Sequence, residues 1–95
     1  MQEEEISEIL FLVRKIAERG EVKPDEKEKI SHLNRLLSGK GSVSVRINQA
    51  AYDEAKKICD VTGISINSYV SGATALRTYE DLKNEKIKEA IKSEG

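Results

Sequence analysis

Several residues that build stable or reactive sites are scarce in this sequence. Its 95 residues include one cysteine, Cys59, which excludes an intrachain disulfide and a cysteine-based metal site. No apolar run approaches the ~20 residues of a membrane-spanning helix, and no signal peptide is visible. We therefore expect a cytoplasmic protein without disulfides, and Cys59 as a small buried apolar residue.

The chain also lacks an excess of either charge. Its 16 Lys and Arg residues stand against 17 Asp and Glu residues, whereas a strongly basic protein would have indicated a nucleic-acid partner directly. Binding to DNA would therefore depend on where individual basic residues lie, with moderate, salt-sensitive affinity.

The motifs of common catalytic sites are missing too. No nucleophile–base pair, paired-carboxylate motif or phosphate-binding glycine loop is visible. His32 has no second ligand-type neighbour at metal spacing. We expect no enzyme, no bound metal and no cofactor.

What the sequence does contain is one segment of strand-like alternation, residues 42 to 48. Three side chains share each face: Val43, Val45 and Ile47 on one, and Ser42, Ser44 and Arg46 on the other. No second such run exists, and a lone strand leaves its backbone groups unpaired. The pattern predicts an antiparallel β-ribbon made by two copies of the chain, narrow enough to enter a DNA major groove.

Two helices are predicted after this strand. The first runs from about residue 49 to 61, with Asn48 as its N-cap and Gly63 just past its end. The second begins after Ser65, its expected N-cap, and continues to about residue 82.

This order of elements resembles the ribbon-helix-helix family of DNA-binding proteins, which includes the phage Arc and Mnt repressors and the methionine repressor. The resemblance covers residues 42 to 80 and depends on the strand ending in Arg46, the Gly63 stop and the helix start at Ser65. It implies a mainly α fold with one short β-strand, a homodimer joined by an intermolecular β-ribbon. It also implies a sequence-specific transcriptional repressor that binds double-stranded DNA.

The resemblance assigns roles to particular residues. Side chains on the outward face of the ribbon would read bases: Ser42, Ser44 and Arg46. The start of the second helix, with a lysine before the strand, would bind phosphate: Lys40, Ser65, Asn67 and Ser68. Apolar side chains would form the dimer core: Val43, Val45, Ile47, Ile58, Ile66 and Val70.

The first forty residues predict a separate helical hairpin. A helical apolar stripe runs from Ile6 to Ala17 and stops at Gly20. A second helix starts at Pro24. Such a hairpin either covers apolar surface of its own dimer, or binds further dimers or a partner protein.

The predicted organisation has four parts: a hairpin at 1–38, a linker at 39–41, a DNA-binding domain at 42–82 and a charged helical extension at 83–95. Other functions also fit. One is an accessory protein for plasmid partition or conjugative transfer; another is a module whose strand pairs with a partner protein. An antitoxin is disfavoured, because the family's antitoxins carry a toxin-binding tail after the second helix.

Overall fold

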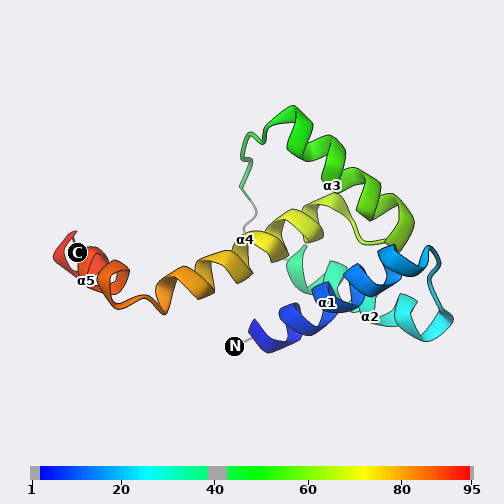
Figure 1. The fold of residues 1–95 in the computed structure, drawn as a ribbon, viewed down its shortest axis with the longest axis horizontal. Coiled ribbons are helices and arrows are strands. Elements are labelled where there is room, and N and C mark those ends of the chain that lie inside the picture. Colours follow the sequence, from blue (N-terminus) through cyan, green and yellow to red (C-terminus); the bar gives the residue numbers. More distant parts are fainter. Residues whose placement is uncertain (1–2, 39–42, 95) are drawn as a thin grey trace.

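The protein is described by a computed structural model covering residues 3–38 and 43–94 (Figure 1). Its secondary structure consists of five helices: α1 (Glu3–Arg19), α2 (Pro24–Leu37), α3 (Gln49–Thr62), α4 (Ile66–Leu82) and α5 (Glu85–Glu94). The first two fold back on each other and pack against α3 and α4, while α5 packs against α4 at one end of the molecule. In this part of the chain no helix is long and apolar enough to cross a membrane.

The helix ends follow local sequence signals. Asn48 caps α3, because its Oδ1 accepts a hydrogen bond from the backbone N–H of Ala51 at 3.1 Å. Gly63 ends α3 with a φ of 84°, the left-handed conformation that favours glycine. Gly20 ends α1 in the same way, and Pro24 stands at the first position of α2. These predicted caps and stops are confirmed.

A carboxylate ties the end of α1 to the start of α2. Glu26 is nearly buried; its Oε1 accepts a hydrogen bond from the Lys23 backbone N–H at 2.9 Å and forms an ion pair with Arg19. The Lys23 N–H, and then Arg19, lower the pKa of Glu26, although partial burial opposes them. The tight connection between the two helices is therefore stabilised by an ionised Glu26.

One core joins the hairpin to α3 and α4. Its buried members are Ile6, Ile9, Val13, Ile16, Ile30, Leu33, Cys59 and Ile64. Six of these eight come from α1 and α2. The boundary drawn between residues 1–38 and 42–82 stays a prediction, but the apolar stripe of α1 is now seen to pack on α4.

The predicted β-strand is wrong. Residues 43 to 48 form neither strand nor bridge, and the described residues contain no strand at all. The regular secondary structure of residues 3–38 and 43–94 is helical only, so the ribbon-helix-helix arrangement with its β-ribbon is not seen. Alternation specifies which side chains share a face, but a strand also needs a partner to pair its backbone, and the chain supplies none.

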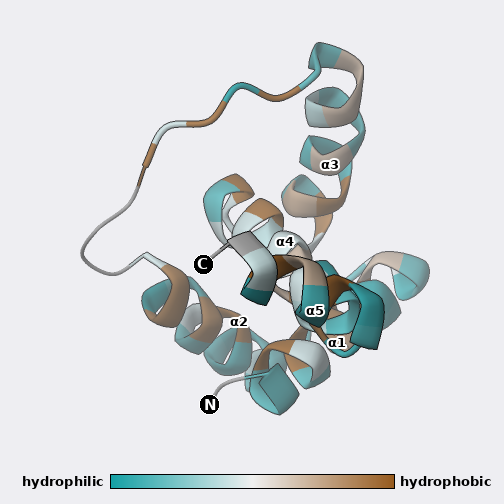
Figure 2. Cartoon of the chain, turned by 90° about the vertical axis from the view of Figure 1, so that its left-hand side faces the viewer, coloured by the Kyte–Doolittle hydropathy of each residue, from teal (hydrophilic) through white to brown (hydrophobic). Residues whose placement is uncertain are grey.

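The apolar side chains of this segment consequently stay in solvent. Val43 is 83% exposed, Val45 79% and Ile47 44%. Figure 2 shows the segment passing outside the helices, with hydrophobic positions spaced along it before α3.

Candidate nucleic-acid interface

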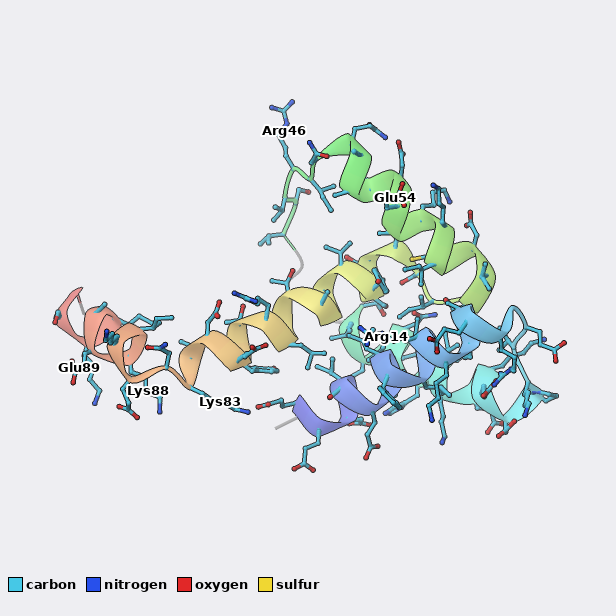
Figure 3. The ribbon with its side chains drawn as sticks, in the orientation of Figure 1. Arg14, Arg46, Glu54, Lys83, Lys88 and Glu89 are labelled. Atoms are coloured by element: carbon cyan, nitrogen blue, oxygen red, sulfur yellow. The ribbon has the colours of Figure 1, made fainter. Side chains whose placement is uncertain are left out.

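Residues 43 to 48 stand away from the packed helices and present the predicted base-reading side chains. Arg46 is exposed and points away from the body of the protein (Figure 3). Ser44 is exposed on the same segment. Ser42 and Lys40, which were predicted to read a base and to bind phosphate, lie outside the described residues. Ser44 and Arg46, two of the three residues predicted to read bases, therefore lie together just before α3.

The charge of Arg46 is not neutralised by a neighbour. Within residues 43 to 82 the other basic side chains form ion pairs on their own helices: Lys56 with Asp60 at 3.4 Å, Lys57 with Glu54 at 3.1 Å, and Arg77 with Asp81 at 3.4 Å. Arg46 makes no ion pair in that range. Exposed pairs contribute little to stability, but each places a carboxylate beside a cation and weakens its attraction for phosphate. Among the basic side chains of residues 43 to 82, Arg46 is thus the one whose charge is most available to an anionic partner.

The start of α4 is organised by two serines. The Ser65 Oγ accepts a hydrogen bond from the Ser68 backbone N–H at 3.1 Å and lies 2.9 Å from the Ser68 hydroxyl. Ser68 is buried, while Ser65 and Asn67 are exposed. Ser65 is therefore confirmed as the N-cap, and the Ser68 hydroxyl is engaged inside the protein.

Free donors remain at this helix start. Among the described residues, no acceptor is bonded to the N–H groups of Ile66 and Asn67, and the positive end of the helix dipole lies there. These donors and the Asn67 side chain are what the structure leaves available for an anion. The phosphate-binding role of Ser65, Asn67 and Ser68 stays a prediction.

The sequence analysis did not predict that α2 borders this helix start. The Asn34 Oδ1 accepts a hydrogen bond from the Ser65 backbone N–H at 3.1 Å. On the same helix, Lys27, Ser31 and Arg35 follow each other at four-residue intervals, and a groove of about 340 Å³ joins Lys27 and Ser31 to Gly63. Their spacing on one helical face was the available signal.

Lys27, Ser31 and Arg35 form a second candidate patch, and acidic residues beside it reduce its positive charge. Asp60 lines the same groove as Lys27, and Glu28 lies beside Lys27 and Arg35. The two candidate patches also lie apart, since Arg46 precedes α3 and Ser65 follows it. A helix of this length separates them by about 20 Å along its axis. The two patches are therefore separate surfaces of one chain.

The predicted dimer-core residues divide into two groups. Ile58 and Ile66 pack, partly buried, against the core of their own chain, and Val70 is half-buried. The three residues of the extended segment remain exposed. Near Ile58 lies an open groove of about 490 Å³ between α1, α3 and α4, with these apolar lining residues: Leu10, Val13, Ala17, Tyr69, Ala73 and Leu76.

The described residues include no group of three or more His, Cys, Asp or Glu side chains arranged to hold a metal ion. Cys59 is buried, and burial raises the pKa of its thiol.

Comparison with protein-family models, with curated proteins and with solved structures finds no match to this chain.

Proposed function

We propose that this protein binds double-stranded DNA through residues 43 to 48 and the start of α4, and regulates transcription as a cytoplasmic repressor. The observation that carries this is the placement of Arg46: exposed, directed away from the fold and without the ion pair that the other cations of residues 43 to 82 possess. Arginine is the commonest bidentate partner of guanine in the major groove. The sequence resemblance of residues 42 to 80 to ribbon-helix-helix proteins led to the same assignment, but the β-ribbon of that family is not seen in the described part of the chain, so the proposal depends on Arg46 itself and not on a ribbon.

We further infer that the protein acts as a homodimer. Val43 and Val45 expose most of their surface and Ile47 exposes 44% of it, all on one short segment, and apolar surface gathered in this way marks an interaction site. The chain has a net charge of −1, so two copies repel each other only weakly. A two-fold dimer would duplicate Arg46 and the start of α4, giving two copies of each contact with DNA.

The test begins with selection of bound fragments from genomic and plasmid DNA. Fragments from a single promoter would indicate a repressor. Iterated repeats would instead indicate the alternative role in plasmid partition or conjugative transfer. No enrichment over random duplex would contradict sequence-specific binding.

A matched pair of arginine variants then tests the site. Arg46→Ala should weaken binding to the selected site by about 1–3 kcal/mol. Arg77→Ala, which removes another exposed charge, one that is paired with Asp81, should weaken it much less. Neither variant should change the thermal midpoint appreciably, because both side chains are exposed. Equal losses of affinity in fluorescence anisotropy would contradict a specific role for Arg46.

A further inference from the structure

The hairpin carries a second open groove that none of the proposed DNA contacts uses. It has a volume of about 680 Å³ and is lined by α1 and α2 alone. Ile9, Phe11 and Leu12 form its apolar part, and Phe11 is 57% exposed. Phe11 has the largest side chain among the exposed apolar residues of the described chain. An aromatic ring this exposed in a groove is typical of a docking surface.

The rim of this groove is acidic. Its charged members are Glu5, Glu8, Asp25 and Glu28, against Lys15, Lys29 and His32. Glu5 contacts His32, and Lys15 lies over the Phe11 ring, 4.8 Å from its centroid. The other three carboxylates form no ion pair within the described part of the chain. A partner for this groove should therefore combine an apolar stripe with flanking basic residues.

The last helix of the protein has this character. Ile87, Ala90 and Ile91 share one face of α5, and at 100° per residue Lys86 and Lys88 lie on either side of Ile87. The acidic residues Glu85 and Glu89 fall on the opposite face, although Lys88 approaches Glu85 within 3.8 Å.

This apolar face of α5 is only partly covered in the single chain: Ile87 is half-buried, whereas Ala90 and Ile91 are exposed. No side chain of α5 that the structure describes is buried, and Ile91 is 52% exposed. The helix packs on α4 alone, and Figure 1 places it at the end of the molecule opposite the connection between α1 and α2. The exposed part of the face, around Ala90 and Ile91, is therefore accessible to another molecule.

We propose that α5 of one copy docks in the α1–α2 groove of a second copy. Ile87 and Ile91, one turn apart, pack on Phe11, and Lys86 and Lys88 face the carboxylates of the rim. The two surfaces differ and lie on different parts of each chain, so the contact is heterologous and each copy can both donate its α5 and accept one in its groove. It involves none of the residues proposed to bind DNA and does not depend on that function.

A mixing experiment tests the contact, in chains that also carry Val45→Asp so that the exposed 43–47 segment does not contribute. The groove variant is Phe11→Ser, the helix variant is Ile91→Glu, and Val61→Ser is the control, since Val61 is exposed outside both surfaces. Sedimentation velocity should show concentration-dependent association of the Val45→Asp parent and of the control. Each surface variant alone should associate roughly tenfold or more weakly.

The two surface variants should then complement each other. An equimolar mixture should form a 1:1 dimer and nothing larger, because one chain retains α5 and the other retains the groove. A monomeric parent, as expected if α5 folds into the groove of its own chain, would overturn the proposal. Unchanged association of either variant, or no complementation, would do the same.

A charge exchange keeps the test decisive if an apolar variant fails to fold. Glu28→Lys and Lys88→Glu should each weaken association, and the double variant should regain it, since opposite charges again face each other. Failure of the double variant to recover would refute the pairing of α5 with this rim. DNA binding by the Arg46 site is measured separately, so either proposal can fail alone.

Discussion

Gly72 lies where α4 packs against α1, so substitutions at this position test that contact through the stability of the protein. A Cβ added at this position would lie 3.1 Å from Leu10 Cδ1, 3.4 Å from Leu37 Cδ1 and 3.6 Å from Ile6 Cγ2. In an exposed helix, replacing glycine by leucine stabilises by up to about 1 kcal/mol through helix propensity. At this packed position, Gly72→Leu must displace the neighbouring side chains, and overpacking of that kind costs about 1–3 kcal/mol.

The smaller replacement gives a graded expectation. In Gly72→Ala the gain in helix propensity opposes a small shift of the flexible Leu10 end, so its free energy of unfolding should change by less than about 1 kcal/mol. The leucine variant should therefore be clearly less stable than the alanine variant. The two variants should differ because the leucine side chain extends beyond Cβ, where the side chains of α1 and α2 already fill the space.

Urea denaturation followed by circular dichroism measures these changes. Thr78→Leu, at an exposed position of the same helix, is the control and should stay within about 0.5 kcal/mol of the parent. If the hairpin did not pack on α4, Gly72 would be exposed. Gly72→Leu would then stabilise the protein, and that result would refute the packing described above.

Three further expectations follow from single residues. In a chain that also carries Phe11→Ser, so that docking of α5 does not contribute, Val45→Asp should abolish the homodimer formed through residues 43 to 47 in sedimentation. It should leave the thermal midpoint nearly unchanged, because Val45 lies in solvent; unfolding would show that the segment belongs to the core. Asn67→Asp should slightly stabilise α4 through its dipole yet weaken DNA binding at low salt, and unchanged binding would exclude a phosphate at this helix start. The lowered pKa of Glu26 means that its ionised form contributes stability above the ordinary glutamate pKa. Glu26→Gln should thus be less stable than the parent near neutral pH, with the difference vanishing as pH falls through the lowered pKa; a pH-independent difference would contradict this.

Local signals made most helix ends predictable. The helix expected over residues 49 to 61 is found at Gln49–Thr62, and its N-cap Asn48 and its stop at Gly63 act as expected. The predicted Ser65 cap acts in the same way at the start of α4. Each of these signals involves backbone groups within four residues of the side chain concerned, so the sequence contains both partners of the interaction.

Contacts between distant elements were not predictable in this way. Nothing in the local pattern shows that Gly72 faces Leu10, or that Asn34 bonds to the backbone of Ser65. The alternation of residues 43 to 48 likewise specified two faces but not a hydrogen-bonding partner, which is why the strand prediction was wrong. The candidate interface was therefore predicted as a set of residues, and its separation into two patches had to come from the structure.

That separation has a consequence for salt dependence. In the proposed complex with DNA, one chain would offer Arg46 at one patch and Lys27 and Arg35 at the other, and would neutralise about two or three phosphates. Each neutralised phosphate contributes about −0.9 to the slope of log affinity against log salt concentration. A single chain should show a slope of roughly −2 to −3 and a homodimer roughly −4 to −5.

The slope therefore separates the two stoichiometries without a structure of the complex. For a dimer, raising salt from about 50 to 200 mM should lower affinity by roughly two to three orders of magnitude, and Val45→Asp should halve the slope. Lys27→Ala should flatten the slope in proportion to its share of the contacts, whereas loss of Lys57, already paired with Glu54, should leave it nearly unchanged. An unaltered slope in Lys27→Ala would confine DNA contact to the Arg46 patch and remove α2 from the interface.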